Sequence, residues 1–220
     1  APLVPAFLEA LSRGKGPSMF LNIGGIANIA VLGLGPSVVG YDTGPGNVLM
    51  DSWCQQHLGK AFDDQGRWAQ QGQCQMELLN WCLQHPYFSQ DFPKSTGRDC
   101  FNLQWLQQFP LEQFSLQDVQ ATLCFLTAKS IAQEILRHPG VDHLFVSGGG
   151  IYNQTLMTHL ETALPNLTIA TTAVLGIPPD EMEAAAFAYL AWCRLQGYPG
   201  NVPSVTGAIR SAILGAIYEP

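Results

Sequence analysis

The sequence MFLNIGGIANIAVLGLGPSVVGYDTGPGN, residues 19–47, predicts how the fold begins. Its β-forming residues fall into three runs, at 19–23, 26–32 and 37–41, and the pair Gly24-Gly25 separates the first two. Two apolar runs joined by two glycines are typical of a β-hairpin. We therefore expect an antiparallel meander of three strands at the start of a sheet.

Asp42 follows the third run directly, so we expect it where a strand ends and its side chain can leave the sheet. Gly44 and Gly46 permit a close backbone approach, and Asn47 is a good N-cap for a helix over 48–58. The N–H groups of such a turn, together with the helix dipole, attract an anion. The alternative is an ordinary strand-to-helix turn in which Asp42 is solvated or caps the helix, and this stretch alone favours that alternative.

Gly24-Gly25 allows two interpretations, a structural hairpin and a phosphate-facing turn, which the residues support about equally. A second glycine-rich turn, SGGG at 147–150, follows an expected strand at 141–146 and precedes a helix from about 153 to 164. A strand, a glycine turn and a helix in this order can approach a nucleotide closely. Neither G-x-G-x-x-G nor G-x-x-x-x-G-K-[ST] occurs, so a dinucleotide fold and a P-loop are poorly supported.

Apolar periodicity and helix-ending residues place the remaining elements. We expect helices at about 76–84, 102–109, 115–138 and 181–195, a strand at 167–171, and a tail over 200–220 that packs back as a strand or covering segment.

Two charged groups each have a functional and a structural interpretation. Lys94 and Arg98 flank a Ser-Thr-Gly turn and either bind an anion or pair with Asp99, and we favour the pairing. Glu181 and Glu183 begin an expected helix, where carboxylates also compensate the helix dipole.

The chain carries a net charge of −7 and only 10 Lys and Arg residues in 220. Nucleic acids and anionic membranes require clustered positive charge, so we expect neither as a partner. A phosphate ligand must then be held mainly by backbone amides or by a metal ion.

Six cysteines without a C-x-x-C pair are typical of reduced thiols in a cytosolic protein. No apolar run approaches the ~18 to 20 residues that span a bilayer, and the N-terminus lacks the regions of a signal peptide. The five histidines lack zinc-motif spacing, and we expect no protein metal ligand. These features predict a cytoplasmic protein.

The motifs occur in an order that resembles the second half of an actin-like sugar kinase. Within that superfamily the sequence is similar to anhydro-N-acetylmuramic acid kinases along essentially its whole length. The resemblance implies an α/β fold, namely a ribonuclease H-like or actin-like ATPase lobe with a mixed β-sheet, an N-terminal antiparallel meander and flanking helices. The segments that carry it are LNIGGIAN at 21–28, YDTGPGN at 41–47, KSTGR at 94–98, SGGG at 147–150, EAAAFA at 183–188, VTGA at 205–208 and LGAIY at 214–218.

That family opens the 1,6-anhydro ring of a muramic sugar with water and transfers the γ-phosphoryl group of ATP to the sugar, which feeds cell-wall recycling. The resemblance implies that Asp42 is the general base that activates the water, and that Glu183 contacts sugar hydroxyls. Mg²⁺ is expected to bridge the ATP phosphates. The residues expected to bind ATP are Gly24, Gly25 and Asn28 in the hairpin, Gly44 and Gly46 in the turn after Asp42, and Gly148, Gly149 and Gly150.

One departure from the family pattern is large. Such kinases bind ATP and sugar between two lobes, and nothing before Met19 resembles the phosphate loop of the first lobe. We expect residues 1–18 to be a connecting segment and residues 19–220 to be the C-terminal lobe, with a helical insertion at about 60–114. The partners are then the sugar, ATP and the missing N-terminal lobe, with a homodimer left open, and the isolated chain has little or no kinase activity.

Two alternative functions stay open at this point. The chain is either the catalytic-base lobe of a kinase or a non-catalytic nucleotide-binding or interaction module that kept the fold. A weaker third option is an actin-like ATPase that acts as a conformational machine, and the segment around Glu183 speaks against it.

Overall fold

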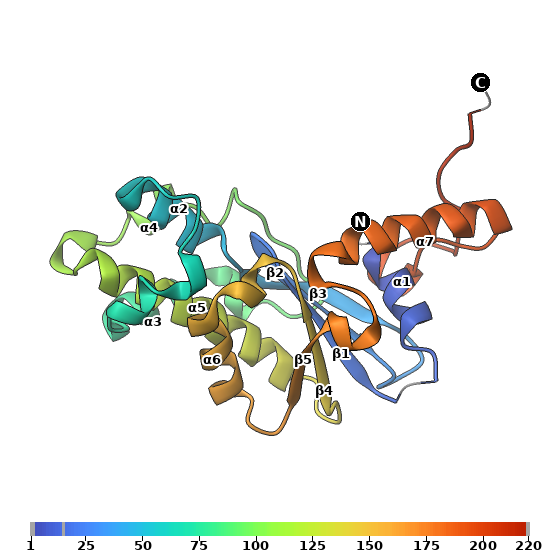
Figure 1. Ribbon diagram of the computed structural model, residues 1–220, viewed down its shortest axis with the longest axis horizontal. Coiled ribbons are helices and arrows are strands. Elements are labelled where there is room, and N and C mark those ends of the chain that lie inside the picture. Colours follow the sequence, from blue (N-terminus) through green and yellow to red (C-terminus); the bar gives the residue numbers. More distant parts are fainter. Residues whose placement is uncertain (1–2, 15, 219–220) are drawn as a thin grey trace.

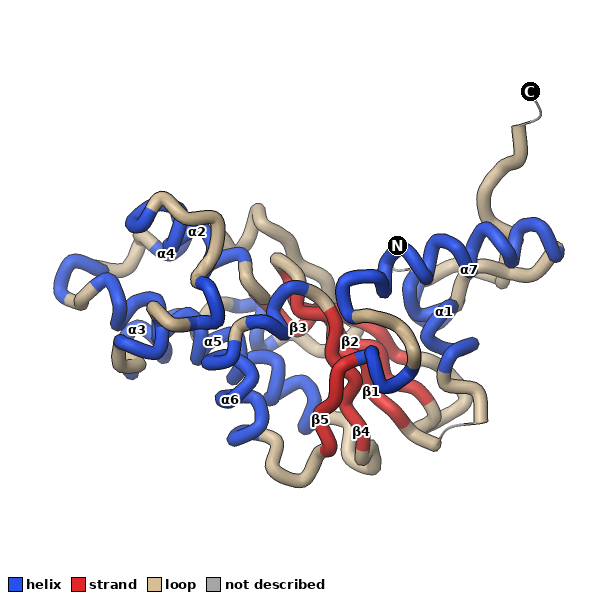
Figure 2. Tube along the Cα trace, in the orientation of Figure 1, coloured by secondary structure: helices blue, strands red, loops and turns tan. Residues whose placement is uncertain are grey.

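The computed structural model describes residues 3–14 and 16–218, and it has a central sheet with helices on both faces (Figures 1 and 2). Five strands lie in the order β3-β2-β1-β4-β5. Strand β2 is antiparallel to β1 and β3, whereas β4 is parallel to β1 and β5. The fold class predicted from the sequence, a mixed sheet that begins with an antiparallel meander, is confirmed. The strands are β1 (Ser18–Ile23), β2 (Ile26–Leu32), β3 (Val39–Pro45), β4 (His143–Ser147) and β5 (Thr168–Thr171).

One face of the sheet forms the main core, because side chains alternate between the two faces of a strand. In β1, Met19, Leu21 and Ile23 all point to this face and are fully buried. The helices that cover it are α2 (Val48–Leu58), α5 (Leu116–Leu136) and α6 (Gln154–Ala163). Burying one such side chain stabilises the fold by about 1.5–3 kcal/mol, so this face holds the sheet in place.

The opposite face is covered over only half of its length. Helices α1 (Val4–Leu11), α7 (Met182–Gln196) and α8 (Pro203–Thr206) lie there, and Leu8 and Met182 pack with Phe20 of β1. Helix α1 lies inside the segment that we expected to be a connection. The other half of this face, at the carboxyl ends of β1 and β4, stays open and holds the candidate site.

Strand β3 is longer at its carboxyl end than the sequence suggests. It continues to Pro45, so the expectation that Asp42 lies at a strand end is wrong. Gly44 and Pro45 continue the ladder opposite Ala27 and Ile26, after an irregularity in the β2 register. A proline is tolerated here because β3 is an edge strand of the sheet.

Most predicted helices occur close to their expected positions. Helix α5 begins where expected, because the Ser115 hydroxyl accepts a hydrogen bond from the Asp118 N–H group at 3.1 Å. Helix α7 ends at Gly197, whose φ of 72° is left-handed. The helix expected at 102–109 is shorter, α4 (Leu103–Leu106).

The region 60–114 contains short helices and turns rather than long elements. It holds α3 (Met76–Leu83), α4 and 3₁₀ turns at Asp64–Gly66, Ala69–Gln71, Pro86–Ser89 and Leu111–Gln113. Later in the chain, further 3₁₀ turns occur at Gly149–Tyr152, Thr172–Leu175 and Pro179–Glu181.

The tail forms no strand in its described part, 200–218. It packs back as a covering segment, the other form that we expected, because α8 covers β3 and the Ser204 hydroxyl donates to the Val38 carbonyl at 2.8 Å. Beyond α8 the tail turns back on itself, because Gly200 donates to the carbonyl of Ala212. Within the ranges 3–14 and 16–218, no helix combines the length and apolar character that crossing a membrane requires.

Candidate functional site

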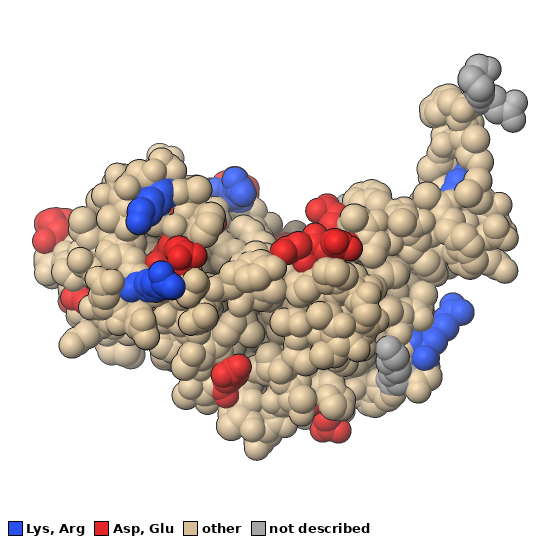
Figure 3. All heavy atoms as spheres, viewed as in Figure 1, with Lys and Arg blue, Asp and Glu red and all other residues tan. Residues whose placement is uncertain are grey.

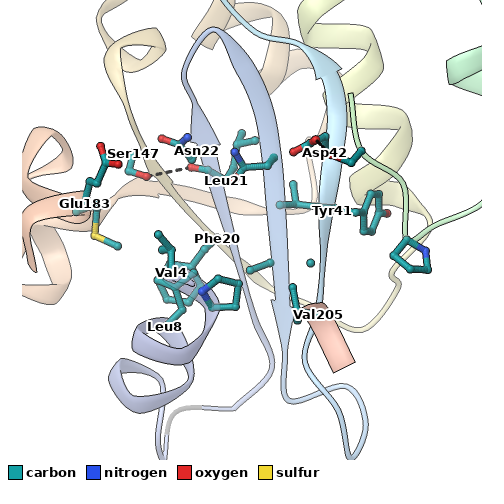
Figure 4. A pocket seen from close by; sticks show the side chains of 18 of the residues that line it. Val4, Leu8, Phe20, Leu21, Asn22, Tyr41, Asp42, Ser147, Glu183 and Val205 are labelled. Atoms are coloured by element: carbon teal, nitrogen blue, oxygen red, sulfur yellow. Dashed lines mark hydrogen bonds between the residues drawn. The ribbon is translucent and has the colours of Figure 1, made fainter. Parts of the chain in front are cut away.

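A cavity of ≈ 590 Å³ lies on the open half of the sheet (Figure 4). Four polar residues from four adjacent strands line it. Asp42 of β3 lies opposite Asn28 of β2, Asn28 lies opposite Asn22 of β1, and Asn22 lies opposite Ser147 of β4. We call these four residues the polar row. Glu183 of α7 lines the same cavity from the side away from Asp42.

The other end of the cavity is apolar. Val4 and Leu8 of α1, Phe20 of β1 and Val205 of α8 lie there (Figure 4). The cavity therefore suits a molecule that carries hydroxyl groups at one end and apolar groups at the other.

The carboxylate of Asp42 is held at one of its two oxygens. Its Oδ2 atom accepts a hydrogen bond from the Ser95 hydroxyl at 2.8 Å and another from the Thr96 N–H group at 2.9 Å. Oδ1 has no hydrogen-bond partner among residues 3–14 and 16–218. One oxygen thus anchors the side chain, and the other can accept a proton from a molecule in the cavity.

The backbone of Asp42 is fixed as well. Its N–H group donates to the Lys94 carbonyl at 3.1 Å, and its carbonyl accepts from the buried Tyr87 hydroxyl at 2.6 Å. The segment Lys94–Thr96 therefore runs along the edge of β3 and contacts both the main chain and the side chain of Asp42.

The expected pairing of Lys94 and Arg98 with Asp99 is wrong. Lys94 pairs instead with Glu134 of α5, with Nζ 2.7 Å from Oε1. The guanidinium of Arg98 lies beside the hairpin, since a Cβ atom on Gly25 would be 3.3 Å from its Nη2 atom. Within the described residues Arg98 forms no ion pair. Lys94 is buried, and its side chain reaches Glu134 rather than Asp99.

The hairpin Gly24-Gly25 is tied to the start of α2. Its carbonyl groups accept hydrogen bonds from the N–H groups of Gly46, Asn47 and Val48 at 2.8 to 3.0 Å. Asn47 stands at the N-cap position, but its side chain does not cap the helix and donates to the Ile23 carbonyl at 3.3 Å. These three N–H groups are therefore occupied, in contrast to the expectation that the turn faces an anion.

Several of the expected ATP-binding glycines have a packing reason for being glycine. A Cβ atom on Gly46 would overlap the Gly24 carbonyl, and one on Gly148 would lie 2.6 Å from Oδ1 of Asn22. A Cβ atom on Gly44 or Gly150 would likewise meet a packed side chain. Gly149, in contrast, has an open side. A binding role for these glycines stays a prediction.

A second, smaller cavity of ≈ 240 Å³ lies beside Gly149. Asp51 of α2, Asp63, Tyr152 and Asn153 also line it. Burial raises the pKa of Asp51 to about 6; the Asp63 carboxylate adds to this, and Arg98 opposes it. Both oxygens of Asp63 already accept backbone N–H groups, at 2.9 Å each. This cavity lies between α2 and the glycine turn after β4.

Acidic side chains gather over the start of α7 on the face in Figure 3, where Asp180, Glu181 and Glu183 lie. Of these, Glu183 lines the large cavity, and it also lies in the first turn of the helix, where it complements the dipole. No three His, Cys, Asp or Glu side chains of the described part of the chain are placed to share a metal ion.

The structure adds Asn22, Ser147, Ser95 and Thr96 to the candidate site. Asn22 had a local signal, because it is a polar residue inside an otherwise apolar strand. Ser95 and Thr96 lie in the KSTGR segment, but nothing local indicated their contact with Asp42, since it joins segments more than 50 residues apart.

Comparison with known proteins gives one match over the whole chain. Residues 1–220 match the family model of anhydro-N-acetylmuramic acid kinase.

Similar solved structures were also found. The activator of the 2-hydroxyisocaproyl-CoA dehydratase from Clostridium difficile, with bound ADPNP, is 12% identical, with 85% of this chain and 68% of that chain covered and a TM-score of 0.49. Component A of the (R)-2-hydroxyglutaryl-CoA dehydratase from Acidaminococcus fermentans is 16% identical, with coverages of 84% and 68% and a TM-score of 0.45. The xylulose kinase from Rhodospirillum rubrum is 14% identical, with coverages of 88% and 48% and a TM-score of 0.44.

Proposed function

Because the chain belongs to the anhydro-N-acetylmuramic acid kinase family, we propose that it supplies the catalytic base to a kinase acting on anhydro-N-acetylmuramic acid. In this reaction the sugar, water and ATP yield N-acetylmuramic acid 6-phosphate and ADP. The observation that carries the proposal is how Asp42 is held: it lines the cavity, its Oδ2 atom is anchored, and its Oδ1 atom has no hydrogen-bond partner among the described residues.

The proposed step balances as follows. The water oxygen forms a bond to C1 of the sugar while the bond from C1 to O6 breaks, and O6 takes the γ-phosphoryl group as ADP leaves. Asp42 Oδ1 accepts the proton that the water loses and later returns it to solvent. A positioned general base of this kind is typically worth ~10² to 10⁴ in rate.

Asn22, Ser147 and Glu183 would bind the sugar. Asn22 and Ser147 offer hydrogen-bonding groups on the same side of the sheet as Asp42, and Glu183 offers acceptors on the other side of the cavity. The apolar end would take the methyl-bearing parts of the substrate. The hydroxyl groups would then lie next to the base, which orients C1 toward the attacking water.

The phosphates of ATP would lie on the hairpin side. Arg98 brings a positive charge next to Gly25, and Gly149 presents an open backbone near the smaller cavity. We assign Gly24, Gly25 and Asn28 to the phosphates and Gly148, Gly149 and Gly150 to the nucleoside. The oxygen-rich polar row fits Mg²⁺, which binds few protein carboxylates and keeps waters and substrate phosphates as ligands. When bound, Mg²⁺ neutralises charge on the phosphates.

A second lobe is part of this proposal, because such a kinase closes two lobes over ATP and sugar. The 220-residue chain alone would then have little or no activity, and the full-length protein would act in the cytoplasm on sugars recovered from the cell wall. If the full-length protein binds nucleotide but never turns over this sugar, the non-catalytic module is the better description.

The test uses the full-length protein with ATP and anhydro-N-acetylmuramic acid in ¹⁸O-labelled water. We expect ATP consumption that depends on the sugar, and a sugar phosphate that carries one ¹⁸O atom in the sugar and none in the phosphate. Mass spectrometry of the product and its phosphate fragment separates the two positions. Label in free phosphate would mean that the protein only hydrolyses ATP, and sugar-independent consumption would refute the proposed substrate.

A further inference from the structure

A buried ion pair lies directly behind Asp42. Lys94 Nζ is 2.7 Å from Glu134 Oε1, and the two side chains are only 1% and 6% exposed. Lys94 also donates to the Tyr87 carbonyl at 3.3 Å and lies over the Tyr87 ring. The pair thus links the segment along the edge of β3 to helix α5, two parts of the chain 40 residues apart.

The second carboxylate oxygen of Glu134, Oε2, accepts a hydrogen bond from Tyr41, which lies on the strand that carries Asp42. The hydroxyl of Tyr41 donates to Glu134 Oε2 at 3.1 Å and lies 2.7 Å from Nε2 of His138. Tyr41 precedes Asp42, so the two side chains point to opposite faces of β3. Burial, then the charge of Glu134, raises the pKa of Tyr41, while burial lowers the pKa of His138. The hydroxyl thus stays protonated and able to donate.

One arm of this network reaches solvent. Arg137 contacts Glu134 Oε2 at 3.3 Å and Asp91 Oδ1 at 2.9 Å, and the Asp91 side chain is 95% exposed. The exposed contact between Arg137 and Asp91, the outer pair, can therefore be removed by mutation without removing the buried contact between Lys94 and Glu134, the inner pair.

Stability alone does not account for the inner pair. Taking two charges out of water costs several kcal/mol per ion, and a well-packed apolar pair of similar volume is often equally stable. The ion pair also fixes the position of Lys94 against β3. The next two residues, Ser95 and Thr96, then meet Oδ2 of Asp42.

We propose that Lys94 and Glu134 are positioning residues that hold the Ser95–Thr96 donors on Oδ2 and so keep Oδ1 of Asp42 aimed into the cavity. This inference rests on the proposed function for its catalytic consequence. Its geometric content, the anchoring of Lys94–Thr96 to α5, is independent of the substrate.

The test replaces both charges in the full-length protein, with the double variant Lys94→Met/Glu134→Met. Removing one partner alone would leave a buried charge and risk unfolding, whereas the apolar pair leaves neither of the two charges unpaired. A misplacement of about 1 Å costs about 10²-fold in rate, so we expect a fall of this order in kcat at unchanged KM for ATP.

The matched control is Asp91→Asn, which removes the exposed arm of the network and leaves the inner pair intact. It should keep wild-type kcat and the wild-type exchange rate of the Thr96 N–H group. A merely structural role of the inner pair would lower the melting temperature of the double variant and leave kcat of the folded protein unchanged.

Amide hydrogen exchange gives a readout that needs no turnover. The Thr96 N–H group, which is bonded to Asp42, should exchange faster in the double variant than in wild type and Asp91→Asn. If the wild-type protein is inactive on the sugar, the proposed function is refuted. The exchange rates of the Thr96 N–H group would still show whether the ion pair holds Ser95 and Thr96 on Asp42. Wild-type kcat and wild-type Thr96 exchange in a folded double variant would overturn the inference.

Discussion

Replacing Asp42 by Asn tests the candidate base most directly. The amide oxygen can still accept from Ser95 and Thr96, and the backbone bonds of residue 42 to Lys94 and Tyr87 do not depend on the side chain. The two bonds to Oδ2 lose their charge assistance, which costs about 1 kcal/mol each. The group in place of Oδ1 becomes an NH₂, which donates and cannot accept a proton.

The substitution should therefore slow the chemical step without weakening the binding of ATP. We expect kcat to fall by ~10² to 10⁴, the usual contribution of a general base, and at ~1.36 kcal/mol per tenfold change this is about 2.7 to 5.4 kcal/mol in activation free energy. The assay is coupled ADP formation by the full-length protein with the anhydro sugar, together with calorimetric measurement of ATP affinity, which should stay unchanged.

The matched control is Asp142→Asn, an exposed aspartate outside the cavity lining. It should leave kcat unchanged. An Asp42→Asn variant that folds and retains kcat within about tenfold of wild type would place the base elsewhere.

Three further predictions concern the framework around Asp42. Tyr87→Phe leaves the Asp42 carbonyl without its 2.6 Å donor, so urea unfolding should show a loss of about 1 to 3 kcal/mol, and an unchanged midpoint would mean that water replaces the hydroxyl. Gly46→Ala places a Cβ atom on the Gly24 carbonyl and should lower the unfolding free energy by about 1 to 3 kcal/mol, whereas Gly35→Ala, with open space around it, should have little effect; equal melting curves would contradict the packing argument. Burial raises the pKa of Asp51 from 3.8 to about 6, so the native state binds more protons than the unfolded state in that interval and stability falls as pH rises through it. Asp51→Asn should flatten this dependence and melt higher than wild type at pH 8, and parallel melting-temperature curves for the two proteins would refute the assignment.

Local pattern was sufficient for most of the framework. The two runs around Gly24-Gly25 are rich in β-forming apolar residues, and they occur as β1 and β2, which are buried along most of their length. Helix α5 begins at Ser115 because a capping side chain satisfies an N–H group that has no partner within the helix. Such signals act over a few residues and can be read in order along the chain.

The boundaries that failed depend on neighbours in space. Residues Gly44 and Pro45 are poor β-formers, yet β3 extends to them because β2 offers a ladder on one side and the edge tolerates a proline. The same pairing placed Asp42 within the strand and opposite Asn28. The predicted partner of Lys94, Asp99, was wrong for a related reason. The observed partner, Glu134, is distant in sequence and reaches Lys94 only through the packing of α5.

The sequence alone therefore determined the five strands and most of the longer helices, and that Asp42 and Glu183 were the acidic residues to examine. Both follow from short-range patterns and from the order of motifs that the family shares. Only the tertiary structure decided how Asp42 is held and what surrounds it. Strand register aligns Asn22, Asn28 and Ser147 with it, and a buried ion pair brings Ser95 and Thr96 to one of its oxygens. Register and buried charge pairing are set by contacts across many residues, and local propensity carries no information about either.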